Sequence, residues 1–173
     1  RDERAARLKL QHVLGKRLPA VWPLIRIETV LRQHVVDLPP SAPGEAMIIE
    51  TDVPDARYWA FQLCGLWFEG SDYANRQTSV NNHQARIDGD GRFRCVLAHE
   101  DPGVPNWLDA AGHTEGLLQY RWIWTRDNPR PSCRIVKLAD VRKQLPADTP
   151  RVSAADRARG IAVRRRHIAR REL

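Results

Sequence analysis

Short stretches in which apolar and polar residues alternate fill the middle of the chain. Residues at alternate positions of a β-strand point to opposite faces, so such stretches predict strands that are buried on one face. Turn sequences separate them, and the strongest is Asp-Gly-Asp-Gly at 88–91, because Asp and Gly tolerate a positive φ. The predicted strands are 46–53, 57–68, 79–88, 92–99, 116–125 and 133–139.

Both ends of the chain have a helical pattern instead. Over residues 1–36 apolar residues recur near helical spacing, and Pro19 and Pro23 interrupt them, which predicts two helical pieces. Near the other end, Ser153 is placed to cap a helix, and Asp156 lies near the positive end of its dipole. The expected organisation is a helical segment at 1–37, a linker at 38–45, a β-sandwich at 46–150 and a basic helix at 151–173.

About six strands separated by turns rather than helices predict a mainly β protein. We expect an antiparallel β-sandwich or jelly-roll-like domain, with an N-terminal helical segment and a C-terminal basic helix. The 173 residues suffice for one such domain with a packed core. No apolar run approaches the roughly 20 residues that a membrane-spanning helix requires.

Four segments together resemble the C-terminal domain of the DUF1214 family of bacterial proteins. They are PDARYWAFQL, YANRQTSVNNHQARIDGDGR, HEDPGVPNWLDAAGHTEGLLQYRW and LPADTPRVSAADRA, and the resemblance covers residues 44–171. Its most specific element is Asn106-Trp107-Leu108, which proline follows in much of the family and Asp109 follows here. The resemblance implies a β-sandwich or jelly-roll domain, commonly preceded by another β-rich domain.

The same resemblance bears on the extent of the protein and on its activity. Because the chain begins with Arg1 rather than Met, we expect either a short member of the family or the later half of a longer protein. An upstream domain or a second chain is then an expected partner. The family has no assigned function, so the resemblance implies no catalytic residues.

The loop at 101–118 carries the strongest candidate chemistry. Asp109, His113 and Glu115 form a candidate general acid/base group, since histidine changes its charge near neutral pH. His99, Asp101, His113 and Glu115 form a possible metal cluster, although their spacing matches no metal signature such as HExxH. The structural alternative is favoured: Trp107 plugs one end of the sandwich and Asp109 accepts amide protons in an Asx turn.

Aromatic residues are numerous for a small sandwich, and alternation places some of their rings away from the core. Such rings form an apolar pocket for a small apolar or amphipathic ligand, or pack in the core or against another domain. Gln62, Gln77 and Asn81 supply polar groups among the same strands. The candidate ligand-binding residues are Tyr58, Trp59, Trp67, Arg76, Asn106, Trp107, Arg121 and Trp122.

Charge and cysteine content add two further expectations. The formal net charge of +7 is concentrated in arginines after residue 150, and apolar residues lie between them. This pattern favours a solvated helix face or a dock for an acidic partner surface over nucleic-acid binding. Cys64, Cys95 and Cys133 form no CxxC motif, which predicts reduced thiols and a cytoplasmic location.

The leading hypothesis is a ligand- or substrate-binding β-sandwich domain of a larger bacterial protein, with an aromatic pocket. One alternative is a hydrolase-like enzyme that uses the loop at 101–118. The other is binding of an anionic surface or nucleic acid by the arginine-rich C-terminal helix.

Overall fold

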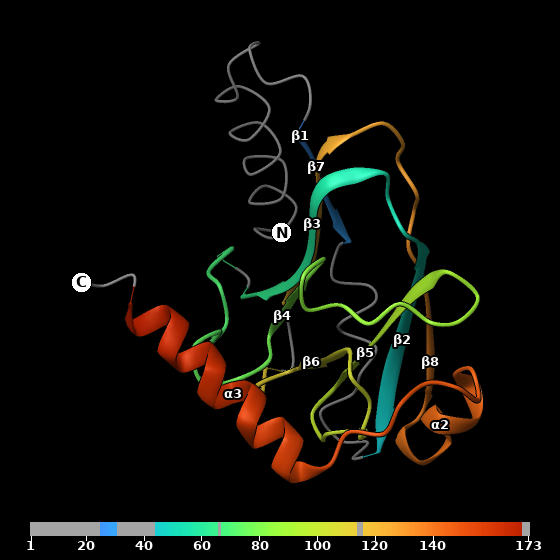
Figure 1. Ribbon diagram of the computed structural model, residues 1–173, viewed down its shortest axis with the longest axis vertical. Coiled ribbons are helices and arrows are strands. Elements are labelled where there is room, and N and C mark those ends of the chain that lie inside the picture. The colour runs from blue at the N-terminus through green and yellow to red at the C-terminus, as the bar shows by residue number, and fades with distance from the viewer. Residues whose placement is uncertain (1–24, 31–43, 66, 114–115, 171–173) are drawn as a thin grey trace, which may run out of the picture.

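The computed structural model describes residues 25–30, 44–65, 67–113 and 116–170. They form two four-stranded sheets that pack face to face as a β-sandwich (Figure 1). The first sheet has the strand order β1-β7-β3-β4, and the second sheet has the order β6-β5-β2-β8. The strands are β1 (Ile25–Val30), β2 (Glu45–Asp52), β3 (Ala56–Cys64), β4 (Ser79–Asn81), β5 (Arg92–Ala98), β6 (Trp107–Asp109), β7 (Leu117–Thr125) and β8 (Ser132–Lys137). The mainly β fold predicted from the sequence is confirmed.

The core lies between the sheets and contains a cluster of aromatic rings. Trp59 and Phe61 of β3 and Trp122 of β7 reach it from the first sheet, and Phe93 of β5 reaches it from the second. The centroids of the Trp59 and Phe93 rings lie 4.8 Å apart in an edge-to-face arrangement. Phe61 stacks on Phe93 at 5.1 Å. Because such pairs stabilise beyond the area they bury, these four rings fix how the two sheets pack.

The N-terminal prediction is wrong where the structure describes it. Residues 25–30, expected in a helix, form strand β1, which pairs antiparallel with β7. Their sequence, IRIETV, is rich in β-branched residues, which favour strands because they lose side-chain freedom in a helix. The rest of the predicted helical segment lies outside the described residues.

Two other elements differ from the prediction. The strand expected over 79–88 ends at Asn81, because the chain turns there and the amides of Gln84 and Ala85 donate to the Asn81 carbonyl. Strand β6 was not predicted, since its three residues are too few to show alternation. It pairs parallel with β5, so the second sheet is mixed rather than purely antiparallel.

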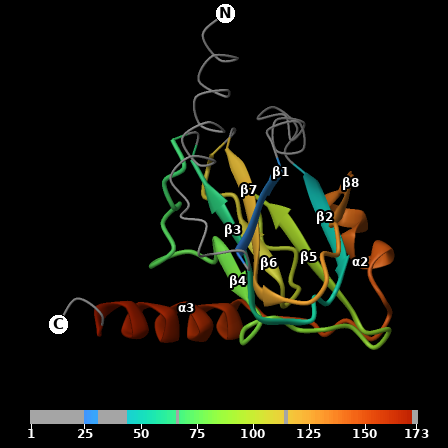
Figure 2. The ribbon, with the colours of Figure 1, turned by 90° about the horizontal axis from the view of Figure 1, so that it is seen from above.

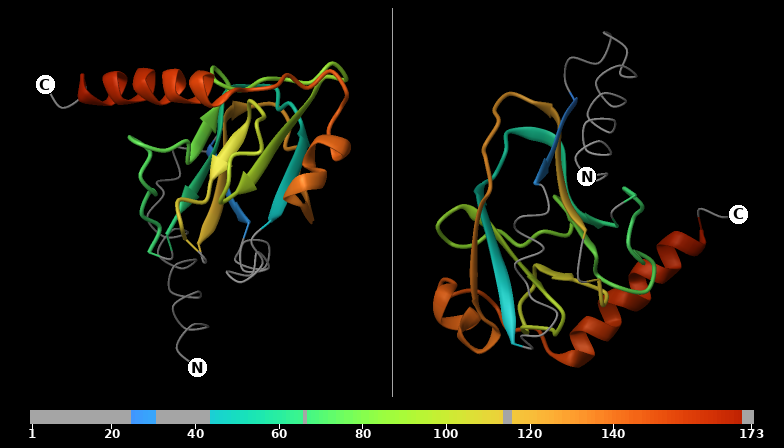
Figure 3. Two further views of the ribbon diagram at one scale, coloured as in Figure 1. Left: turned by 90° about the horizontal axis from the view of Figure 1, so that it is seen from below. Right: turned by 180° about the vertical axis from the view of Figure 1, so that it is seen from behind.

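Three helical elements follow β8: the 3-10 helix η2 (Leu138–Asp140), α2 (Val141–Gln144) and α3 (Ala154–Ala169). The predicted N-cap of α3 is confirmed, because Ser153 and Asp156 form a complete capping box. Helix α3 crosses one end of the strands, and its C-terminal half extends past them (Figures 2 and 3). None of its residues is buried.

Two smaller predictions concern the thiols and the membrane. Cys64, Cys95 and Cys133 are free thiols, and the first two are buried, as expected. Within the described residues, no helix combines the length and apolar character needed to cross a membrane.

Candidate functional site

The loop at 101–113 is organised as a structural turn around Asp109. The side chain of Arg76 donates to Asp109 Oδ2 at 3.0 Å, and the Ala111 amide donates to Asp109 Oδ1 at 2.8 Å. The second contact is the Asx turn expected from the sequence. Both carboxylate oxygens of this buried aspartate are therefore occupied within the protein.

The structure does not bring the side chains of the proposed acid/base group together. The His113 side chain is exposed, and the backbone amide of this residue donates to the Ala110 carbonyl. Glu115 lies outside the described residues. His99 is exposed, and Asp101 is bound by Arg157 through two hydrogen bonds of 2.8 and 3.1 Å. Across the described ranges, no three His, Cys, Asp or Glu side chains group as metal ligands.

The aromatic pocket is not assembled from the expected rings. Trp59 and Trp122 are core residues, exposed by 3% and 1%. Trp107 is also buried, and its indole nitrogen donates to the Ala98 carbonyl at 3.0 Å. Trp67 is 82% exposed. The prediction that Trp59, Trp107 and Trp122 bind a ligand in an aromatic pocket is wrong, because the fold buries all three side chains.

Asn106 and Arg76 also have structural partners. The Asn106 side chain accepts from the Arg86 amide at 2.8 Å and donates to the Arg86 and Arg94 carbonyls at 2.6 and 2.8 Å. It thus joins the chain before β5 to the chain before β6. Arg76 pairs with Asp109 through one nitrogen, and about half of its side chain stays exposed.

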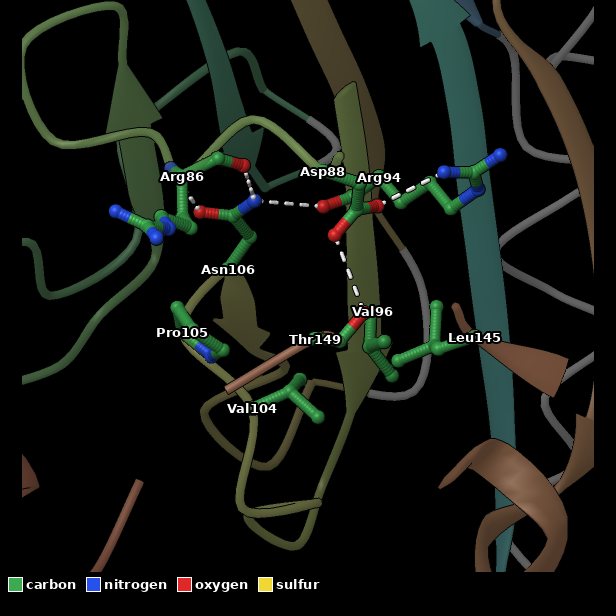
Figure 4. Close-up of a pocket in the computed structure, with 9 residues that line it drawn as sticks. All are labelled: Arg86, Asp88, Arg94, Val96, Val104, Pro105, Asn106, Leu145 and Thr149. Atoms are coloured by element: carbon green, nitrogen blue, oxygen red, sulfur yellow. Dashed lines mark hydrogen bonds and ion pairs between the residues drawn. The ribbon is translucent and has the colours of Figure 1, made fainter. Parts of the chain in front are cut away.

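A small recess beside Asn106 is filled by its own contacts (Figure 4). Within it, Asp88 accepts from Arg94 at 2.9 Å and from Thr149 at 3.1 Å. The remaining space holds at most about one water molecule. The recess is therefore a junction between segments rather than a binding pocket.

The outer face of the first sheet offers a different arrangement, which we call the outer polar row. It consists of Gln119 on β7, Gln62 on β3 and Ser79 on β4, together with the arginines that contact its two ends. Gln119 is in register with Gln62, and Gln62 is in register with Ser79. Residues paired in antiparallel strands share a face, so the three side chains cross the sheet in one line. They lie opposite the core residues Phe61 and Leu118 of the same strands.

Arg121 is placed over one end of this row. Its guanidinium donates to Gln119 Oε1 at 2.7 Å, and Gln119 is itself 3% exposed. Burial raises the pKa of the Cys64 thiol, and the positive charge of Arg121 partly offsets that rise. The guanidinium thus reaches from the middle of β7 toward the start of this strand, where Gln119 and Cys64 lie.

Arg164 of α3 is placed over the other end. It donates to Ser79 Oγ at 3.1 Å and to the Ser79 carbonyl at 2.8 Å. Burial lowers the pKa of Arg164, since a low-dielectric surrounding disfavours the charged form. Among the described residues, no carboxylate lies within ion-pair distance of Arg164 or Arg121.

These contacts define what the outer polar row can do chemically. Two guanidiniums, two amides and a hydroxyl offer many donors, and the row spans about 10 Å from β7 to β4 at the usual strand spacing. Partly buried arginines normally pair with carboxylates or phosphates, with which they form strong charge-assisted hydrogen bonds. Tyr58 lies on the same face of β3, where it adds an aromatic ring.

The fold is similar to that of two solved structures. One is an uncharacterised protein from Burkholderia cenocepacia, with a TM-score of 0.58 and 35% sequence identity over 66% of this chain and 30% of that one. The other is the VPA0106 protein of Vibrio parahaemolyticus, with a TM-score of 0.50 and 16% identity over 72% of this chain and 33% of that one. The chain therefore spans about a third of the length of either protein. No protein-family model and no protein of curated function matches the sequence.

Sequence reasoning identified only part of this site. Tyr58 and Arg121 were candidates, and Gln62 was among the polar groups noted with them. Arg164 was missed as a partner of Ser79, because the two residues are 85 positions apart. Gln119 was not a candidate, and nothing in the sequence indicated that it would be buried.

Proposed function

We propose that this chain is a non-catalytic ligand-binding domain of a longer protein, and that its ligand is a small amphipathic molecule with a carboxylate or phosphate group. The anionic group binds at the outer polar row, where the positive charges of Arg121 and Arg164 approach it from the two ends. The apolar part of the ligand packs on Tyr58 and neighbouring side chains of the same face.

One observation carries this proposal: two arginines without a carboxylate partner in the described structure lie over one row of polar side chains. A desolvated cation without a counter-charge is costly, and an anionic ligand removes that cost. The size of the two similar proteins supports the proposal that the domain acts within a longer chain.

We further propose that the chain is related to the DUF1214 family, that its sandwich has a jelly-roll-like arrangement, and that the protein is cytoplasmic. The motifs around Asn106 support the first, and the three free thiols support the last. The hydrolase-like alternative has less support, because Asp109 is bound by Arg76 and Ala111 rather than by His113.

The test is a titration of the full chain with octanoate and, separately, with inorganic phosphate, followed by amide shifts in NMR spectra. Arg121→Gln and Arg164→Gln each remove one charge and keep hydrogen-bonding capacity. We expect each to weaken binding about tenfold or more, as for a lost charge-assisted contact. Arg165→Gln is the matched control, since it removes an exposed neighbouring charge.

The two probes separate the sources of the anionic group. Stronger binding of octanoate identifies a carboxylate ligand with an apolar tail, and stronger binding of phosphate identifies a phosphorylated one. If neither probe moves the amides of the outer polar row, or if Arg165→Gln weakens binding as much as Arg164→Gln, the proposal is wrong.

A further inference from the structure

Helix α3 has two faces, and only one of them packs against the domain. At about 3.6 residues per turn, Arg157, Ile161, Arg164 and Ile168 lie on one side of the helix. All four are partly buried, so this side contacts the domain. The opposite side carries Arg159, Val163, Arg166 and Arg170, which are exposed. We call this second set the distal stripe.

The distal stripe is strongly cationic. The one acidic residue within α3 is Asp156, which caps the helix and forms an ion pair with Arg159. Arg166 and Arg170 form no ion pair with any described residue. The stripe runs about 16 Å from Arg159 to Arg170 along the axis. It lies largely on the half of α3 that extends past the strands (Figure 1).

An apolar side chain interrupts the charges. Val163 lies between Arg159 and Arg166 on the stripe and is 42% exposed. An apolar contact flanked by arginines is typical of a protein interface, where arginine is enriched and the fully buried centre is apolar. Sites for single-stranded nucleic acids usually add aromatic side chains that stack on the bases. Helix α3 carries no Phe, Tyr or Trp, which favours a protein partner for the stripe.

We propose that the distal stripe is a docking site for the acidic surface of a protein partner. Carboxylates of the partner pair with Arg166 and Arg170, and a small apolar side chain of the partner packs on Val163. The distal stripe shares no residue with the outer polar row, because Arg164 points to the domain while the stripe points away from it.

Poly-glutamate is a suitable probe for this site, and its binding to the full chain can be measured by fluorescence anisotropy at several salt concentrations. We expect binding that weakens as salt rises, because the contact is between exposed charges. The double variant Arg166→Gln/Arg170→Gln should weaken it about tenfold or more. Arg165→Gln is the matched control, since Arg165 is also exposed but lies off the stripe.

Three results would overturn the proposal. One is absence of binding, and another is an equal loss in Arg165→Gln. The third is tighter binding of duplex DNA or of vesicles containing phosphatidylserine than of poly-glutamate, which would assign the stripe to another class of partner. Circular dichroism of each variant checks that α3 remains helical, since arginines near a helix C-terminus also stabilise the helix.

Discussion

The guanidinium of Arg157 stacks on the indole ring of Trp107, with its central carbon 5.0 Å from the ring centroid. The same guanidinium donates to both oxygens of Asp101 and to the Val104 carbonyl at 2.6 Å. It also donates to Gln77 Oε1 at 2.8 Å, in the segment before β4. One side chain of α3 thus binds segments that belong to both sheets.

Arg157→Ala should lower the free energy of unfolding by about 2–3 kcal/mol. The substitution removes the guanidinium that donates to Asp101 and to the Val104 carbonyl, and the Asp101 and Arg157 side chains are 29% and 12% exposed. Urea unfolding measures the change. Arg165→Ala should stay within about 0.5 kcal/mol of the parent, as is usual for an exposed site. Equal effects of the two variants would contradict the anchoring role of Arg157.

Ser153→Ala should destabilise the first turn of α3 by about 1 kcal/mol, the usual contribution of an N-cap side chain. The Ser153 hydroxyl accepts from the Asp156 amide at 3.2 Å and is lost in the variant. Hydrogen exchange of the Asp156 amide should become faster, while exchange in the strands stays unchanged. Unchanged protection of that amide would show that the cap does not hold the helix end.

Asp109→Ala should lower the free energy of unfolding by about 1–2 kcal/mol, because a buried acceptor of two hydrogen bonds is removed. Asp109→Asn keeps an acceptor for the Ala111 amide and should cost less. His113→Ala should change stability by no more than about 0.5 kcal/mol, since its side chain is exposed. A large effect of His113→Ala on the free energy of unfolding would contradict this view of the loop and would support a functional role for it.

Stability should fall in acid through the carboxylates around Arg94. The hydrogen bond from Arg94 lowers the pKa of Asp90 from 3.8 to about 2. Burial raises the pKa of Glu50, but hydrogen bonds from Arg94 and Arg134 bring it below its ordinary value of 4.5. Both groups stay charged in the folded chain at pH values where the unfolded chain takes up protons.

The contribution of these carboxylates is therefore complete above their ordinary pKa values and is lost as the pH falls toward about 2. Urea midpoints measured at neutral pH and at several lower values should show this decline. Asp90→Asn removes one of the titrating groups, so its stability should depend less on pH. An identical pH dependence in the variant would show that Asp90 has no part in it.

The strands of the sandwich were largely predictable from local pattern. In β3 and β7 the alternation is regular, so Trp59, Phe61 and Trp122 point inward as the two-residue period requires. The alternation predicted which side chains share a face of the strand, but not which aromatic rings are buried between the sheets. Trp59 and Phe61 pack on Phe93, and Trp122 packs on both of them, so these three rings belong to the core rather than to a pocket.

The parts that escaped prediction depend on contacts between distant residues. Strand β6 exists because Asn106 and Trp107 bond to chain segments that lie next to them only after folding. The pairing of Arg164 with Ser79 likewise needs α3 to lie across the end of β4. The arginines near the C-terminus predicted a basic helix. They did not indicate which face of that helix packs against the domain.

Arg164 and Arg166 belong to the same helix, two positions apart, so one rigid element carries a residue of the outer polar row and a residue of the distal stripe. A partner that shifts α3 would also move the Arg164 guanidinium relative to Ser79. Thermodynamic linkage then requires the reverse effect: an anion bound at Arg164 alters the affinity of the partner by the same factor. The arrangement makes α3 a physical link through which occupancy of one surface can be sensed at the other.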